Sequence, residues 1–482
     1  MKVSVVSRPG VNYPSADDYF SPHERYPEYA HDHVARSENP VYEMVRQTFA
    51  QAGLDEEHYG QGNWNPLGEF IDAGNSVFVL CNFVCHRRVG ESNEDFQSKC
   101  THASVIRAIL DYVLIAVGGG GKVTFGNAAL QGCQWERVLQ ETGSSALLQF
   151  YSRAGAPVQA RDLRLFVVES DLMGRSVRKE VRDSSHAAEV DLESDSLLRA
   201  HYDGGPEPHY RVLDYDPRRT ERCHSRESHR YLVHKAVLES DVVLSVPKLK
   251  THQKVGVTLG LKGFVGTVGH KDCLAHHRLG GARTGGDEYP GGNIIRHLAS
   301  RLHDWVYSRD SSGASNTWRV LDRSLRRAIG RMGGIPSGGW SGNDTAWRMS
   351  LDLGRIVHNA DAEGLMRESP QRRHLCFIDG IRGGEGEGPL SPKAVDSGVV
   401  VFSDDVALAD RVACRLMGLD PSSIPLVHQA FRLDKWPITR AGLSPHPVAM
   451  NGERITEAEI LPVLSRPFLM PRGWRQPAKP SR

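Results

Sequence analysis

Residues Val242–Val246 form a short run of apolar and β-branched side chains that leads directly into a segment rich in glycine and in cations. An uninterrupted apolar run of this length is typical of a buried strand. Pro247 is expected to end the strand, because proline has no N–H group to donate to a neighbouring strand. The sequence therefore predicts a charged, glycine-rich loop at the carboxyl end of a buried strand.

The loop that runs on to Pro290 combines the features of an anion site. Glycines let a ligand approach the backbone closely, and ammonium and imidazole groups supply positive charge. Open α/β sheets bind their ligands at the carboxyl ends of strands, so we expect an anion pocket here. The alternative, a solvated loop, is disfavoured because Val257, Leu261 and other apolar residues must take some of the charges into the interior. The cations are Lys248, Lys250, His252, Lys254, Lys262, His270, Lys271, His276, His277, Arg278 and Arg283.

Composition limits the partners of this chain of 482 residues. Its 59 basic and 58 acidic side chains nearly balance, so no global field attracts nucleic acid or a membrane surface. We find neither a signal peptide nor a membrane span and expect a cytoplasmic protein. The eight cysteines are scattered without a CxxC pair. An iron-sulfur cluster is therefore not expected, and a reducing compartment would leave all eight as thiols.

The order of predicted elements indicates an α/β fold. Val77–Leu80 reads as a strand, 105–117 as a helix for which Thr101 or Ser104 is the expected N-cap, and Lys122–Phe125 as the next strand. Strand, helix and strand with short joints predict a mostly parallel sheet with flanking helices. The run GGGGK follows a helix and precedes a strand, the reverse of a Walker loop, so it is rejected as a phosphate loop. We divide the chain into an extended N-terminal arm, the first part of the α/β core, a helical insertion, the second part of the core and a poorly ordered proline-rich tail: 1–40, 41–290, 291–370, 371–460 and 461–482.

Polar side chains also follow other predicted strands. Asn82 follows the strand that ends near Leu80, and Asp379 follows the strand Leu375–Ile378 on a glycine-rich loop with Glu385. Carboxylates on such a loop suit cation binding or proton transfer, although solvated carboxylates are the alternative. Asp404 or Asp405 is explained as the cap of a following helix.

These stretches resemble a known group. The segments SDVVLSVPKLKTHQKVGVTLGLKG, GHKDCLAHHRLG and FIDGIRGGEGEGPLSPK are similar to the bacterial and archaeal domain-of-unknown-function family numbered 362, in its long form without ferredoxin repeats. The resemblance, which runs from about residue 39 to residue 420, implies one α/β unit whose strand-end loops converge. Some relatives carry ferredoxin modules, which implies a link to redox chemistry. A fainter likeness to nickel-pincer lactate racemases is an analogy only.

The chain also departs from the family pattern. It has Leu80-Cys81-Asn82 in place of Lys-Pro-Asn, 126–129 read Gly-Asn-Ala-Ala in place of Gly-Asp-Ala-Pro, and Lys262-Gly263 replaces Lys-Asn. Each change removes a polar group from a predicted strand end. Whether the chain is an active member is left open.

The residues favour an enzyme that acts on a small phosphorylated or carboxylated metabolite. Lysines hold an anion, and histidine exchanges protons near neutral pH. The mixed N and O ligands would also suit a divalent metal, whose identity spacing alone cannot choose. The predicted catalytic residues are His252, Lys250, Asp379 and Glu385; the substrate-binding residues are Lys248, Lys262, Asn82, His102 and His277; the metal ligands are His252, Asp379 and Glu385.

Two other functions remain open at this point: a non-catalytic protein that binds a cofactor or metabolite, including a redox-associated protein without its own cluster, and a structural partner in a larger assembly. A nucleic-acid binder is not expected, because the cations are confined to one region. If Lys250 holds the anion, Lys250→Ala should abolish anion binding and leave the melting temperature nearly unchanged.

Overall fold

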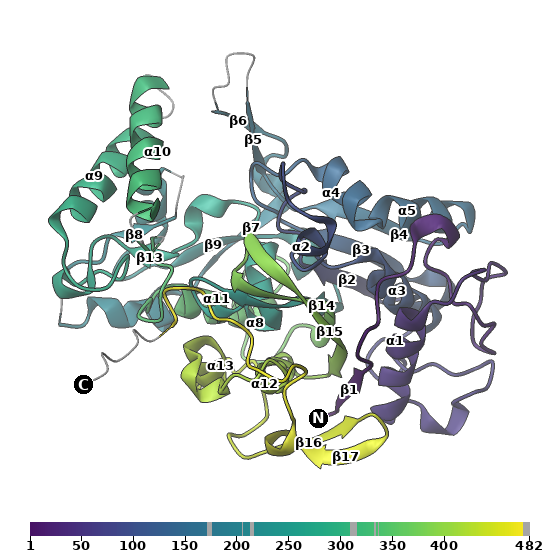
Figure 1. Ribbon diagram of the computed structural model, residues 1–482. Coiled ribbons are helices and arrows are strands. Elements are labelled where there is room, and N and C mark those ends of the chain that lie inside the picture. Colours follow the sequence, from purple (N-terminus) through teal and green to yellow (C-terminus); the bar gives the residue numbers. More distant parts are fainter. Residues whose placement is uncertain are drawn as a thin grey trace.

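A large mixed sheet forms the centre of the protein (Figure 1). The computed structural model describes residues 1–170, 176–204, 206–212, 216–308, 316–331, 334–335 and 337–475. The strand order is β17-β16-β1-β15-β14-β10-β2-β3-β4. Off this path, β11 pairs with β14 and with β12. The α/β class is confirmed. The strands are β1 (Val3–Ser7), β2 (Ser76–Cys81), β3 (Lys122–Asn127), β4 (Val158–Asp162), β10 (Val242–Val246), β11 (Lys248–His252), β12 (Gly256–Val257), β14 (Arg373–Glu387), β15 (Ser391–Ser403), β16 (Pro447–Met450) and β17 (Glu453–Thr456).

Strand β10 lies at the middle of the parallel part. Val242 pairs with Val77 of β2 on one side and with Arg373 of β14 on the other, and both pairings are parallel. All five residues of β10 are buried, as expected of a parallel strand covered on both faces. The chain moves from β2 through β3 to β4 in one direction, whereas β10 and β14 extend the sheet in the other. The carboxyl ends of β2 and β10 therefore meet at a topological switch point, where open α/β sheets bind ligands.

Strand β10 ends at Val246, before Pro247, as predicted, but the chain then resumes as a second strand instead of a loop. Lys248–His252 continues as β11 along the far half of β14, with Lys248 opposite Asp379 and Lys250 opposite Gly384. Proline lacks an N–H group, but its carbonyl still accepts a hydrogen bond from the N–H of Asp379 at 2.9 Å. The charged residues therefore stand on a strand rather than on a free loop. Their alternation places Lys248, Lys250 and His252 on one side of β11.

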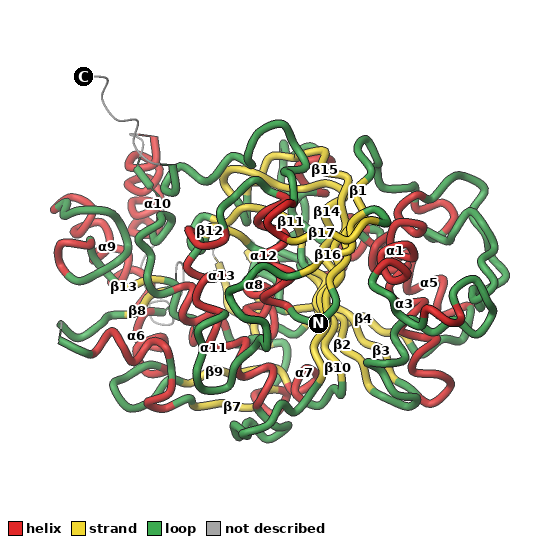
Figure 2. Tube along the Cα trace, turned by 90° about the horizontal axis from the view of Figure 1, so that it is seen from below, coloured by secondary structure: helices red, strands yellow, loops and turns green. Residues whose placement is uncertain are grey.

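Helices cover both faces of the sheet (Figure 2). Two of these helices begin with side-chain caps: Asn39 accepts from the N–H of Tyr42, and Asp405, one of the two expected caps, accepts from the N–H of Leu408. On one face pack α1 (Pro40–Gln51), α3 (Ala103–Val117), α4 (Trp135–Thr142) and α5 (Ser144–Arg153). On the other pack α8 (Leu259–Gly263), α11 (Ala346–Asn359), α12 (Val406–Leu416) and α13 (Pro425–Ala430).

Helix α3 differs from expectation in its cap, which is His102 rather than Thr101 or Ser104. Its window Ala103–Gly120 is long and apolar enough to resemble a membrane span, but 72% of that window is buried inside the protein. A core helix explains this composition.

The smaller elements lie around this core. Helices α9 and α10 form a hairpin that projects from the body, whereas α11, which the sequence places in the same insertion, packs into the core beside α8 (Figure 1). The remaining elements are α2 (Asn93–Gln97), α6 (Pro217–Cys223), α7 (Lys235–Leu238), α9 (Ile294–Ser308), α10 (Asn316–Arg331), β5 (Phe166–Ser170), β6 (Ser176–Glu180), β7 (Ala187–Asp191), β8 (Tyr210–Arg211), β9 (Arg230–His234) and β13 (His277–Arg278).

The described part of the C-terminal tail is bound to the core, although a poorly ordered tail was expected. Phe468 is only 2% exposed, and the indole N–H of Trp474 donates to the carbonyl of Gln253 at 2.6 Å. The last residues, 476–482, lie outside the described part of the chain. The tail therefore reaches the turn between β11 and β12.

Two cysteines are also not the thiols that were expected. Cys223 at the end of α6 forms a disulfide with Cys273, which lies in the glycine-rich segment 50 residues later. The remaining cysteines, Cys81, Cys85, Cys100, Cys133, Cys376 and Cys414, are free and buried.

A thiol titration tests this pairing. Denatured protein that has not been reduced should react at six cysteines, and reduced protein at eight, because only Cys223 and Cys273 are bonded. Eight reactive thiols before reduction would contradict the disulfide, and the variant Cys223→Ser with Cys273→Ser, which should give six under both conditions, is the control.

Candidate functional site

A buried ion pair joins β11 to β14 at the predicted site. The ammonium of Lys248 lies 2.9 Å from Oδ2 of Asp379, and both side chains are fully buried. Asp379 accepts three further hydrogen bonds, from the hydroxyl of Tyr13 at 2.6 Å and from the backbone N–H groups of His102 at 3.0 Å and Ile381 at 3.4 Å. These contacts occupy both oxygens of Asp379. The predicted catalytic carboxylate therefore serves to hold four segments together.

Tyr13 is a member of this group that sequence reasoning missed. It lies on the N-terminal arm, and its hydroxyl also accepts a hydrogen bond from the ammonium of Lys248. Its ring stacks on the imidazole of His102 with 3.9 Å between ring centroids. Burial, and then the charge of Asp379, raise the pKa of Tyr13 well above its usual value. The arm carries no local pattern that marks this residue.

His102, predicted to bind substrate, acts instead as a structural cap. Its Nδ1 accepts a hydrogen bond from the N–H of Ser104 at 3.2 Å at the start of α3. Burial, and then the nearby charge of Lys248, lower the pKa of His102 to about 3. The imidazole is therefore neutral at physiological pH.

Lys250 and Asn82 meet at the switch point, as predicted. The ammonium of Lys250 donates to Oδ1 of Asn82 at 2.6 Å and to the backbone carbonyl of Lys99. Lys250 is fully buried, and burial is the main reason why its pKa falls to about 7. Its hydrogen bonds tie the end of β2 to β11. Lys250 is thus held by protein partners, and we call Lys248, Asp379 and Lys250 with their partners the framework.

A second group of cations, which we call the cationic cluster, lies beyond this framework. It consists of His252, Lys254, Lys262, Lys271 and His276. Burial, and then the charge of Lys262, lower the pKa of His252 and of His276 well below the usual value. Burial also lowers the pKa of Lys262 and of Lys271 to about 7. The charges that shift Lys262, His252 and His276 most are all positive, so no carboxylate compensates them strongly.

Lys262 differs from the other lysines of the site in having no partner among the described residues. Lys254 donates to the carbonyl of Ser337 at 2.6 Å, and Lys271 donates to that of Val265 at 3.0 Å. Lys262 is only 8% exposed, and within the described part of the chain it makes neither a hydrogen bond nor an ion pair. An unpaired buried ammonium is costly, and such a group usually has a ligand as its counterpart.

His252 has a defined orientation in this cluster. Its Nδ1 accepts a hydrogen bond from the N–H of Lys254 at 3.0 Å. The neutral ring therefore carries its proton on Nε2. This makes His252 a donor from Nε2 and fixes which nitrogen can exchange a proton.

The buried side chain of Asp410 sets the position of the helix that carries Lys262. Asp410 of α12 accepts hydrogen bonds from the N–H groups of Gly260 and Leu261, at 2.7 and 2.8 Å, at the start of α8. Leu259 has a φ of 44°, a left-handed conformation that a branched side chain adopts only under strain. Lys262 follows directly on this anchored turn of the helix.

The predicted metal ligands are not gathered around one point. Glu385 binds Arg466 through both oxygens at 2.7 Å and accepts from the N–H of Leu469, so the C-terminal segment occupies it. Burial is the largest influence and opposes ionisation of Glu385, but the hydrogen bonds from Arg466 and Leu469 and the charge of Arg466 together outweigh it, and the pKa is lowered. Among the described residues no three His, Cys, Asp or Glu side chains lie close enough to hold a metal ion. His252, Asp379 and Glu385 thus have separate partners.

The two adjacent histidines lie in different surroundings. His277, the predicted substrate-binding residue, belongs to β13, where it pairs with Arg211, and is 3% exposed. His276 precedes β13, so the strand alternation expected of the pair does not apply to it. The charges of Lys262 and Lys254 act on His276, which places it in the cationic cluster.

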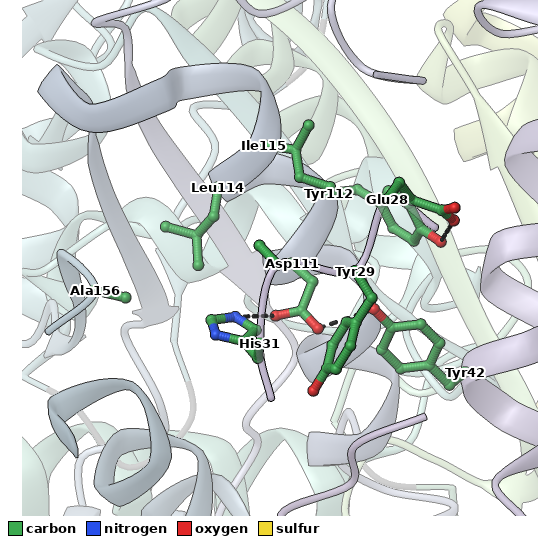
Figure 3. A pocket seen from close by; sticks show the side chains of 10 residues that line it. Glu28, Tyr29, His31, Tyr42, Asp111, Tyr112, Leu114, Ile115 and Ala156 are labelled. Atoms are coloured by element: carbon green, nitrogen blue, oxygen red, sulfur yellow. Dashed lines mark hydrogen bonds and ion pairs between the residues drawn. The ribbon is translucent and has the colours of Figure 1, made fainter. Parts of the chain in front are cut away.

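Two hollows in the surface lie away from this site. One, of about 160 Å³, is lined by Tyr29, His31, Tyr42 and Asp111 beside α3, and there His31 and Tyr42 both point toward the carboxylate of Asp111 (Figure 3). The other, of about 440 Å³, lies between Trp347 of α11 and residues of α13. No residue of the cationic cluster lines either hollow, so the two hollows are separate from the cluster.

Comparisons with known proteins place part of the chain in a family. Residues 207–415 match the model of a family described as "Domain of unknown function (DUF362)". This region contains Lys248, Asp379 and the whole cationic cluster. No curated protein and no solved structure matches the chain.

Two lysine substitutions should have opposite effects on stability. Lys250→Met leaves Asn82 Oδ1 and the carbonyl of Lys99 without their donor, so the free energy of unfolding should fall by about 2 to 4 kcal/mol. Lys262→Met removes an unpaired buried cation, so stability should be unchanged or higher by up to about 1 kcal/mol. Urea unfolding at neutral pH measures both.

This reverses the expectation from the sequence that a change at Lys250 leaves the melting temperature unaltered. Equal losses in the two variants would show that Lys262 has a structural partner. Lys122→Met, at an exposed position at the start of β3, is the matched control and should match the wild type.

Proposed function

Because the chain belongs to the DUF362 family, whose description assigns no activity, we propose its function from the site: it is an enzyme that binds a small anionic metabolite in the cationic cluster. The single observation that carries this proposal is Lys262, a buried ammonium without a partner in the described part of the chain, with a second cation, Lys254, beside it. A bound carboxylate or phosphate would supply the missing negative charge.

Energetics support an anion as the ligand. Burying like charges together is unfavourable, and each cation lowers the pKa of its neighbours. Proteins tolerate such strain at sites where binding relieves it. The framework of Lys248, Asp379 and Lys250 keeps its own charges paired or hydrogen-bonded, so the uncompensated charge is confined to the cationic cluster.

The same residues can transfer protons near neutral pH. His252 is neutral in the empty site and carries its proton on Nε2, with the pKa lowered by burial and by Lys262. Lys262 has a pKa of about 7, which is suited to acid and base roles at physiological pH. An anion would raise both pKa values by adding negative charge. We assign Lys262 and His252 to binding and proton transfer, and Lys254 and His276 to holding the anion.

A non-catalytic binding protein is the second candidate. It is favoured by the state of Asp379 and Glu385, the carboxylates expected to take part in proton transfer, because both are occupied by other protein groups. This candidate predicts anion binding without chemical change of the ligand. Incubating the protein with a bound metabolite and following its conversion by mass spectrometry separates the two.

Small anions should stabilise the protein and take up protons as they bind. Phosphate or oxalate at a hundredfold excess over its dissociation constant should add about 2.7 kcal/mol to the free energy of unfolding. Lys262 has a pKa of about 7 when free, and an anion raises that value. Binding at pH 8 should therefore consume a proton, whereas at pH 6 the lysine is already charged, and affinity should fall as the pH rises from 7 to 9.

Thermal unfolding and titration calorimetry in two buffers of different ionisation enthalpy provide the measurements. Lys262→Met should remove the stabilisation by anions, and Lys122→Met should retain it. If none of a panel of phosphates and carboxylates stabilises the wild-type protein, or if they stabilise Lys262→Met equally, the proposed function is wrong.

A further inference from the structure

We propose that Lys262 is a covalent catalyst: its amine forms a Schiff base with the carbonyl carbon of a small oxo acid. This inference rests on the proposed function, because the cationic cluster must first bind the carboxylate of that acid. It adds a substrate class, a reaction and a nucleophile. The geometry around α8 carries it in the following steps.

A nucleophilic amine must be free of other bonds. Lys248 donates to Asp379, Lys250 donates to Asn82, and both interactions would be lost on covalent modification. Lys271 donates to the carbonyl of Val265. Of the buried lysines of this site, within the described residues, Lys262 alone has its amine uncommitted.

A nucleophilic amine must also be neutral for part of the time. Burial, and then the neighbouring charge of Lys254, lower the pKa of Lys262 to about 7. Near neutral pH a large fraction of the amine therefore keeps its lone pair. A lysine beside a second cation in a desolvated site is a recurring way to activate an amine toward carbonyl compounds.

The helix that carries the lysine is held in place. Asp410 anchors the start of α8 through the N–H groups of Gly260 and Leu261. Lys262 follows directly, is 8% exposed, and its amine has no hydrogen bond or ion pair within the described part of the chain. This amine is therefore the group that the anchored helix offers to a ligand.

The neighbours of Lys262 select an anionic carbonyl compound. His252, His276 and Lys254 lie close enough for their charges to shift the pKa of each other or of Lys262. A carboxylate next to the carbonyl group would be held by the ammonium of Lys254 and by the Nε2–H group of the neutral imidazole of His252 while the carbonyl carbon faces the amine. A neutral ketone lacks that anchor and should react much less.

The reaction is balanced by its own components. The nitrogen lone pair of Lys262 attacks the carbonyl carbon, the C–N bond forms and the C–O π electrons move to oxygen. That oxygen takes two protons, which the amine supplies overall, and leaves as water, so that C=N replaces C=O. His252 Nε2 is the group suited to pass a proton to the departing oxygen. Amine and oxo acid give imine and water, with no oxidant or other reactant.

Trapping with borohydride tests the proposal. The full-length protein is incubated with pyruvate or glyoxylate at pH 7.5 and reduced with sodium borohydride, which converts the imine into a stable secondary amine. Intact mass should increase by one reduced adduct per chain, and peptide mapping should place it on Lys262. Acetone, a neutral ketone, should label the protein at least about tenfold less, the factor that one charge-assisted contact can provide.

Variants separate this inference from the proposed function. Lys262→Arg keeps the charge but has no amine able to form an imine, so it should lose the adduct while anions still stabilise it. Lys122→Arg should label like the wild type. The map of the wild-type protein identifies the modified lysine even if Lys262→Arg does not fold.

Three outcomes would overturn the Schiff base: no adduct, an adduct mapped to another lysine, or equal labelling by acetone. If phosphate and oxalate still stabilise the protein in those cases, the anion site survives and only the covalent step fails. If the anions do not stabilise it either, both proposals fail together.

Discussion

The ion pair between Lys248 and Asp379 is the interaction on which the rest of the structure depends. It is fully buried at the point where β11 continues β10 along β14, and it also receives Tyr13 from the N-terminal arm and the backbone of His102. A buried pair is stable only when its remaining hydrogen-bonding positions are filled, and here the arm and the start of α3 fill them. The pair therefore fixes segments that are far apart in the sequence.

Protein partners occupy the polar groups of this framework, so uncompensated charge is left only elsewhere among the described residues. Asp379, Lys250 and Glu385 are occupied by protein partners, and the uncompensated charge is displaced to the cationic cluster around Lys262. Asp410 holds α8 by two backbone N–H groups, although its burial raises its own pKa to about 8. Asp410 thus fixes the helix that carries Lys262. The unfavourable free energy of burying charged groups is confined to a few residues beside the site, as is usual where ligand binding offsets it.

Both ends of the chain contribute to the site region, which explains why its centre is not apparent from one segment. The N-terminal arm delivers Tyr13, and the C-terminal segment delivers Arg466 to Glu385 and Trp474 to the turn after β11. On the remaining side, the backbone carbonyl of Ser337 receives Lys254. These contacts enclose the cations on several sides, and enclosure is what lowers the pKa values of the lysines.

The sequence by itself determined the α/β class, the central strand Val242–Val246 and an acidic cap for α12, narrowed to Asp404 or Asp405, because apolar runs and caps are local patterns. Only the tertiary structure decided that Lys250 is tied to the framework while Lys262 is left without a described partner. Residue type and spacing are the same for a paired and an unpaired lysine. The difference is made by partners more than a hundred residues away, and such contacts leave no mark on the local sequence.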